Sequence, residues 1–228
     1  MKQIHFHTLQ SKIVNPTGLY LFILIMLLVT CCASPYHSMS LGIMDYNKVD
    51  TVGGISYGYH FNVLRDFRNN AFVQKENQMN IKLVAFTFSN LSERKIDLAS
   101  DLEYCQTEAN IIRPLEPDSI ICMFRLDPKK YRSYLMFMFL NAYWFEPIGT
   151  DYNSELHLRM IPIGIFLGPF FTLYNMSIAK RSNINFGKDL DKYSPFSSIH
   201  PGATRFILIA FKNIDERPIQ IRLKGNKK

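Results

Sequence analysis

Two adjacent cysteines, Cys31 and Cys32, are the residues of this chain whose position best fits a defined chemistry. They follow an apolar run over 19–30, and the segment before that run carries Lys2 and Lys12 but no acid. This order is typical of a secretory signal. In a bacterial lipoprotein signal, a cysteine at the cleavage site receives a diacylglycerol group on its thiol. The sequence therefore predicts lipidation of one of the two cysteines and leaves open which one.

Two other interpretations of this N-terminus stay open. The run over 19–30 could be retained as an anchor, although a spanning helix needs about 20 residues. The cysteines could also be two thiols beside an ordinary cleavage site. The prediction is an exported protein that is membrane-anchored and periplasm-facing, with the outer membrane favoured over the inner one.

A second pair of cysteines, Cys105 and Cys122, lies beyond the export signal. An oxidising compartment permits a disulfide between them. Two buried thiols would explain the pair equally well. The sequence leaves both states open.

Other residue types that perform chemistry are scattered. The chain contains no Gly-x-Gly-x-x-Gly segment, Walker loop, Gly-x-Ser-x-Gly or His-Glu-x-x-His motif. His60, Asp101 and His200 are candidates for a site that only folding could assemble, and no spacing supports them. The prediction is therefore a protein that is not an enzyme and uses no metal or cofactor, with an unrecognised enzyme as one alternative.

The charge of the chain bears on its partners. Lys and Arg number 26 against 19 Asp and Glu, which gives a net charge of +7. These cations are spread singly or in pairs, which argues against a nucleic-acid partner. A basic tail occupies 224–228. A weak attraction to anionic lipid is expected.

Alternating and aromatic-rich segments predict strands on both sides of an apolar middle region. The predicted strands cover 55–61, 80–89, 95–98, 101–107, 111–115, 119–125, 204–211 and 218–223. Turn residues separate them at the spacing of an antiparallel sandwich. The predicted fold is mainly β, an immunoglobulin-like antiparallel β-sandwich with a helical insert. This single domain would cover 55–223, after a signal peptide over 1–32 and a tether over 33–54.

The helical insert is predicted over about 128–193. Asp127 and Pro128 are typical of a helix start. Apolar residues at helical spacing then predict a helix to about residue 145. Its central part is apolar on all sides, which indicates burial in protein or lipid.

The second half of the insert contains an uncharged run over 160–179. Glycines and prolines in its first part predict a strand or loop as far as Gly168 and a helix from Pro169. Gly164 and Gly168 have small-xxx-small spacing, but the prolines favour a close loop over a helix-pairing face. The first interpretation of 160–179 is a buried core segment, and the alternative is contact with the bilayer or with an integral membrane partner.

The chain resembles an uncharacterised group of cell-envelope lipoproteins from Bacteroidota-type bacteria. The segments that carry the resemblance are 54–64, 80–90, 114–117, 131–135, 162–169 and 175–179. The resemblance implies an envelope location and a sandwich-like core, and it implies no active site. The Cys31–Cys32 signal departs from the usual pattern of that group. The predicted function is a non-enzymatic protein-binding or envelope-assembly module with an unidentified envelope protein as partner.

Overall fold

The computed structural model describes residues 32–46, 49–107, 110–148, 155–195 and 198–224. The chain divides into two units, Met1–Cys32 and Ala33–Lys228. The signal region therefore lies almost wholly outside the described residues. The second unit contains all the helices and strands discussed below.

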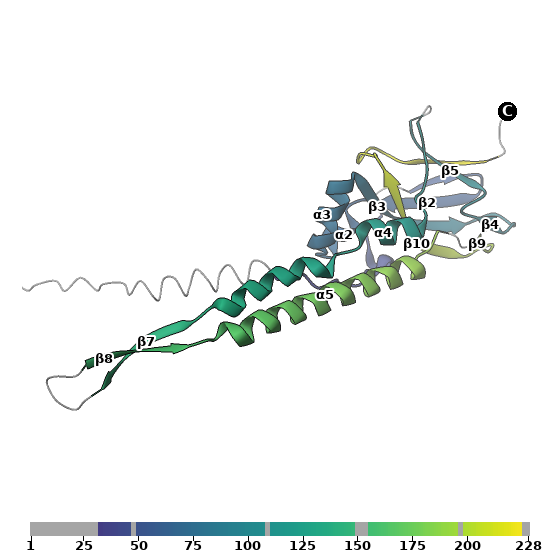
Figure 1. Cartoon of the computed structure of the whole chain (residues 1–228). Helices are drawn as coiled ribbons and strands as arrows, with labels where there is room; N and C mark the ends of the chain where they lie inside the picture. The colour runs from purple at the N-terminus through teal and green to yellow at the C-terminus, as the bar shows by residue number, and fades with distance from the viewer. Residues whose placement is uncertain (1–31, 47–48, 108–109, 149–154, 196–197, 225–228) are drawn as a thin grey trace, which may run out of the picture. The chain divides into compact units, whose positions relative to one another are not determined.

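A four-stranded antiparallel sheet forms the centre of this unit, with the strand order β1, β2, β3, β10 (Figure 1). The strands are β1 (Val49–Val52), β2 (Ile55–His60), β3 (Ile81–Asn90) and β10 (Thr204–Lys212). Gly53 and Gly54 connect β1 to β2 and both have positive φ angles, as a tight hairpin turn requires.

A second antiparallel sheet packs on one face of the central sheet. It contains β11 (Gln220–Leu223), β5 (Leu102–Thr107) and β6 (Asn110–Ile112). Two short strands, β4 (Ile96–Asp97) and β9 (Ser198–Ile199), pair with each other and form a separate small sheet. The core between the two sheets is aromatic, with Phe86, Tyr104 and Phe211 in edge-to-face contact. The predicted antiparallel sheets are present, with helices inserted between their strands.

Helices cover the other face of the central sheet. They are α2 (Val63–Asp66), α3 (Asn70–Met79) and α4 (Pro117–Phe124), with a short 3-10 turn, η1 (Leu41–Ile43), nearby. Leu83 and Ala85 of β3 face these helices, while Phe86 and Phe88 face the second sheet. Because β3 is buried on both faces, its sequence is almost continuously apolar.

Two predictions for this part of the chain are wrong. The predicted strand over 119–125 is the helix α4, because Pro117 opens a helix and Ile120 and Phe124, four residues apart, face the core. The predicted tether over 33–54 is part of the folded unit: it contains η1 and β1, and Tyr36, Met39 and Leu41 are buried in the helical layer.

The insert consists of η2 (Pro128–Phe139), β7 (Ala142–Ile148), β8 (Glu155–Ile161) and α5 (Gly164–Lys192). By the rise of an α-helix, α5 is about 43 Å long. Its second half packs on the helical layer through Phe186 and Leu190. Its first half runs beside η2 toward the β7–β8 hairpin, as Figure 1 shows. We call η2, the hairpin and residues 164–176 of α5 the arm.

The arm differs from the sequence prediction in two ways. The helix that begins at Pro128 is a 3-10 helix that ends at Phe139, and residues 142–145 belong to strand β7. Helix α5 begins at Gly164 and includes Pro169. The apolar stretch 135–140 was predicted to be buried in protein or lipid, and none of its residues is buried in protein.

Candidate functional site

Two glycines hold the helices of the arm together. A Cβ atom on Gly164 would collide with the carbonyl oxygen of Phe137, and one on Gly168 would lie 2.8 Å from the backbone nitrogen of Met138. The backbone N–H of Gly164 also donates to the carbonyl of Leu140 at 2.8 Å. The small-xxx-small pair is therefore a helix-pairing face, contrary to the expectation of a close loop.

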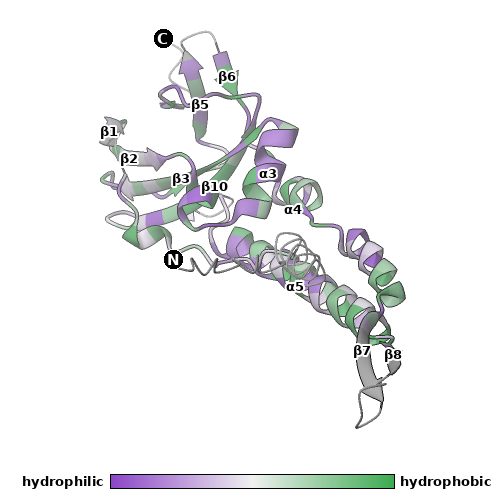
Figure 2. Cartoon of the chain, turned by 90° about the vertical axis from the view of Figure 1, so that its left-hand side faces the viewer, coloured by the Kyte–Doolittle hydropathy of each residue, from purple (hydrophilic) through white to green (hydrophobic). Residues whose placement is uncertain are grey.

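This close packing leaves the large apolar side chains on the outside of the arm. Phe139 is 85% exposed and Phe166 is 77% exposed. Figure 2 shows hydrophobic colouring on both helices next to the hairpin. An apolar surface of this kind is typical of a contact site for a membrane or a protein. Its helical members are Leu135, Met136, Met138, Phe139, Ile165, Phe166, Phe170, Leu173 and Tyr174.

One face of the hairpin continues this apolar surface, while the exposed His157 and Arg159 alternate with it on β8. Tyr143 of β7 pairs with Met160 of β8, and Leu158 lies two residues from Met160 on the same face of the hairpin. All three side chains are more than half exposed. In the described structure β7 and β8 pair with each other and with no other strand. The outer edges of the hairpin are therefore open.

The apolar surface ends at the same level on both helices. On η2 the exposed residues change from basic, at Lys129, Lys130 and Arg132, to apolar from residue 135 onward. On α5 they change from apolar, up to Tyr174, to polar and basic at 177–181. Because the two helices run antiparallel, the basic residues of both meet. We call Lys129, Lys130, Arg132, Lys180 and Arg181 the basic collar.

A cleft of about 600 Å³ opens between the helices at this level. It is lined by Cys122, Arg125, Asp127, Pro128, Lys129, Arg132, Met176 and Lys180. A neighbouring cavity of about 420 Å³ shares part of this lining, namely Cys122, Arg125, Pro128 and Lys180. The rest of its lining is mainly apolar and consists of Ile121, Asn183, Ile184 and Phe186. This cation cluster was not predicted, since its members come from three elements that are far apart in the sequence.

The first residues of the folded unit lie along α5. The backbone N–H of Ala33 donates to Asn175 at 2.6 Å, and that of Met39 donates to the carboxylate of Asp189 at 2.7 Å. The Tyr36 hydroxyl donates to the same carboxylate at 2.8 Å, and burial together with Asp189 raises the pKa of Tyr36. The segment runs in the same direction as α5, so the chain enters the folded unit at Asn175, next to the collar.

The structure places the predicted cysteine sites as follows. Cys31 lies outside the described residues, and Cys32 is exposed. Cys105 and Cys122 are both free thiols, so the disulfide that the sequence permitted is not formed. The reason is their positions in the fold. Cys105 is buried in β5 of the second sheet, whereas Cys122 is exposed on α4, on the opposite side of the central sheet.

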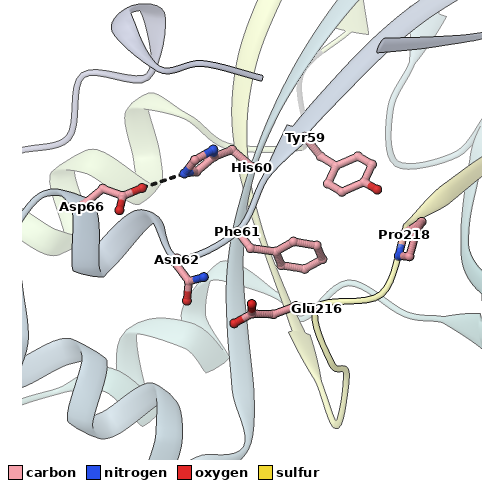
Figure 3. Close-up of a pocket in the computed structure, with 7 residues that line it drawn as sticks. All are labelled: Tyr59, His60, Phe61, Asn62, Asp66, Glu216 and Pro218. Atoms are coloured by element: carbon pink, nitrogen blue, oxygen red, sulfur yellow. Dashed lines mark hydrogen bonds and ion pairs between the residues drawn. The ribbon is translucent and has the colours of Figure 1, made fainter. Parts of the chain in front are cut away.

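His60 lines a separate cavity of about 370 Å³, shown in Figure 3. Its Nε2 lies 2.6 Å from the Asp66 carboxylate, and its Nδ1 lies 3.0 Å from the Asp45 carbonyl oxygen. The other lining residues that the structure describes are Tyr59, Phe61, Asn62, Glu216 and Pro218, with no serine, threonine, cysteine or lysine among them. The histidine therefore has an orienting acid, but no serine or threonine hydroxyl, thiol or amine lines the cavity for it to activate; the hydroxyl of the lining is the phenol of Tyr59.

The other two candidates for an unrecognised enzyme site lie in turns. The Asp101 carboxylate accepts the backbone N–H of Asp97 at 3.0 Å, and this hydrogen bond lowers the pKa of Asp101. His200 is exposed in the turn before β10, where its carbonyl accepts the N–H of Ala203. Neither residue lines the cavity that contains His60. The geometry gives these three residues no shared site.

Within the described residues, no group of three or more His, Cys, Asp and Glu side chains is arranged to hold a metal ion. No described helix combines the length and the apolar content needed to cross a bilayer.

Comparisons with known proteins assign no family to this chain. No protein-family model, no curated protein and no solved structure matches it. The resemblance to envelope lipoproteins stays a prediction, and the arm, its basic collar and the adjoining cleft are the features from which a function can be inferred.

Proposed function

We propose that this protein is a non-enzymatic module of the cell envelope that is held at a membrane surface by inserting its arm into the lipid bilayer. The observation that carries the proposal is the sharp change from apolar to basic residues at one level of both arm helices. The apolar side chains would be stable in the hydrocarbon of a bilayer, and the basic side chains would be attracted to anionic headgroups. Of the two interpretations of 160–179, this observation favours membrane contact over a buried core.

The dimensions of the arm suit one leaflet. From Gly164 to Met176 the helix α5 rises about 18 Å, at 1.5 Å per residue. The hydrocarbon core of a bilayer is about 30 Å thick, so one leaflet contributes about 15 Å. With the collar at the headgroups, the apolar helical part of the arm would therefore extend through one leaflet.

The energetics also favour insertion. Removing one large apolar side chain from water is worth about 1.5–3 kcal/mol. Phe139 and Phe166 alone would contribute about 3–6 kcal/mol before ordering costs. Each Lys or Arg of the collar near an anionic surface adds about 1 kcal/mol. The sum of a few such contributions exceeds the binding free energy of a single acyl chain, which by itself gives only marginal membrane binding.

The N-terminus fits the same membrane. Ala33, the first residue of the folded unit, donates its backbone N–H to Asn175 next to the collar. The predicted lipidation sites, Cys32 and Cys31, are the two residues that precede it in the sequence. We propose that this lipid anchor and the arm act together, because stable attachment takes two membrane-binding signals. Export to a periplasm-facing membrane, with the outer one favoured, is part of this proposal.

The sheets and the hairpin are the parts left for protein contacts. We propose that the two facing sheets form an immunoglobulin-like sandwich whose exposed edges contact another envelope protein. The open edges of the β7–β8 hairpin favour a second candidate function, docking on an integral membrane partner. Unpaired strand edges in hydrocarbon need hydrogen-bond partners, and a neighbouring protein would provide them.

The test uses single-tryptophan variants of the full chain in vesicles. Trp144 is the single tryptophan, so Trp144→Phe provides a silent background. Phe166→Trp then reports on the arm and Lys188→Trp on the exposed charged half of the same helix. Lipids brominated on their acyl chains should quench the fluorophore at position 166 and leave the one at 188 unchanged. Equal, weak quenching at both positions would refute insertion.

A further measurement separates the partner from the bilayer. If the arm docks on an integral membrane protein, position 166 would be shielded in native membranes and unquenched in vesicles that contain lipid alone. That result would replace bilayer insertion by the second candidate.

A further inference from the structure

The cleft at the base of the arm has an unbalanced charge. Arg125, Lys129, Arg132 and Lys180 line it together with one acid, Asp127. The Asp127 carboxylate accepts the backbone N–H of Lys129 at 2.9 Å, as the cap of η2. Within the described residues none of the four cations forms an ion pair with an acid. Four cations around one cavity repel each other unless an anion enters it.

The fold brings these cations together from three elements. Arg125 follows the last turn of α4, and Lys180 projects from α5. Lys129 and Arg132 are three residues apart on η2, and side chains at that spacing eclipse each other on a 3-10 helix. The four charges therefore converge because three chain segments meet here.

The connection between α4 and η2 is fixed in place. The side chain of Asn183 accepts the backbone N–H of Leu126 and donates to its carbonyl, both at 2.8 Å. This pair of hydrogen bonds ties the residue between Arg125 and Asp127 to helix α5. These side-chain-to-backbone hydrogen bonds fix the backbone on one side of the cleft before a ligand enters, which lowers the ordering cost of binding.

The surroundings of the cleft match a lipid better than a soluble anion. The adjoining cavity shares Arg125 and Lys180 with the cleft and is otherwise largely apolar, with Ile121, Ile184 and Phe186 in its lining. A phosphate in the basic cleft would therefore lie beside a slot that suits the first part of an acyl chain. The cleft also lies at the collar, which is where headgroups would be if the arm is inserted.

We infer that this cleft is a binding site for the phosphate group of an anionic phospholipid, with the adjoining cavity taking the start of an acyl chain. The inference rests on the proposed function, because insertion of the arm is what brings the cleft to the headgroups. It adds a defined ligand class, and it predicts that the protein recognises individual anionic lipids in addition to a charged surface.

The test measures the melting temperature of the full chain in detergent with three probes. They are dioctanoyl phosphatidylglycerol, dioctanoyl phosphatidylcholine and inorganic phosphate. A ligand that binds the folded state raises the melting temperature. We expect a rise with phosphatidylglycerol and little or none with the other two. A rise of equal size with inorganic phosphate would mean that the cleft binds a free anion and not a lipid. A rise of equal size with phosphatidylcholine would mean that the cleft does not recognise the charge of the lipid. Either result would overturn the inference.

A matched pair of double variants locates the site. Arg132→Gln with Lys180→Gln removes two charges from the cleft. Lys188→Gln with Lys192→Gln removes two charges from helix α5 at exposed positions outside both the cleft and the basic collar. We expect the cleft variant to lose the phosphatidylglycerol response and the control variant to keep it. An unchanged response in the cleft variant would overturn the inference.

Two readouts keep this test separate from that of the proposed function. Lys180→Arg keeps the charge and should keep the response, so loss of folding in the glutamine variants can be recognised. Quenching at position 166 reports arm insertion without involving the cleft. If quenching persists while the lipid response is absent in the unmodified chain, the cleft inference fails and the proposed function stands.

Discussion

The packing of the arm can be tested by the same substitution at two glycines of helix α5. Gly168 lies against η2, whereas a Cβ on Gly187 would find only the Ile121 side-chain end, 4.0 Å away. Replacing glycine by alanine inside a helix stabilises it by about 0.5–1 kcal/mol when space permits. Gly187→Ala is therefore expected to stabilise the helix by that amount.

At Gly168 the expected sign is opposite. The new Cβ would lie 2.8 Å from the backbone nitrogen of Met138, while ordinary contact begins at 3.4 Å. The two helices would have to separate by about 0.6 Å, and overpacking of this kind costs about 1–3 kcal/mol. After the intrinsic gain of alanine, Gly168→Ala is expected to destabilise the arm by about 0.5–2 kcal/mol.

Amide hydrogen exchange is the assay of choice, because the arm can open while the sheets stay folded. The full chain would be compared in detergent with each variant. Faster exchange over 164–174 and over η2 is expected for Gly168→Ala, and slower exchange in the second half of α5 for Gly187→Ala. If both substitutions slowed exchange on α5, the helices would not be in contact at Gly168 and the arm would not be a helix pair.

Two further predictions concern the sheet domain. The Tyr104 hydroxyl is buried with no hydrogen-bond partner among the described residues, so Tyr104→Phe should raise the free energy of unfolding in urea by about 1 kcal/mol; a decrease would mean that the hydroxyl has a partner. Burial raises the pKa of Glu76, although the backbone N–H of Leu83 donates to its carboxylate. Because the folded pKa lies above the unfolded one, this residue's contribution to stability should fall as the pH rises above about 4.5. Glu76→Gln should remove that part of the pH dependence, and an identical dependence in both proteins would contradict the assignment.

Three of the four strands of the central sheet could be predicted because their pattern is local, whereas β1 was assigned to the tether. Residues 55–61, 80–89 and 204–211 are rich in β-branched and aromatic residues, and they correspond to β2, β3 and β10. The segment 119–125 was predicted wrongly, because a short apolar run suits a strand or a buried helix equally well. Pro117, just before it, was the available signal for a helix.

The arm was only partly predictable. The apolar run over 160–179 and its flanking cations were visible, and contact with a membrane was kept as an alternative to burial. The hairpin inside the insert was not recognised, because the apolar spacing after Pro128 continued to fit a helix past Phe139. The cleft was not recognised either, since the cations that line it are up to 55 residues apart, from Arg125 to Lys180.

The sequence by itself therefore determined β2, β3 and β10 of the central sheet and the apolar character of the arm, because both follow from the local spacing of side chains. Only the tertiary structure decided that the apolar side chains of the arm face outward. Exposure depends on what packs against a segment, and here Gly164 and Gly168 bring two helices together with their large side chains on the outside. The same antiparallel pairing aligns the basic residues of both helices and creates the cleft, so a candidate binding site arises from residues that have no common pattern along the chain.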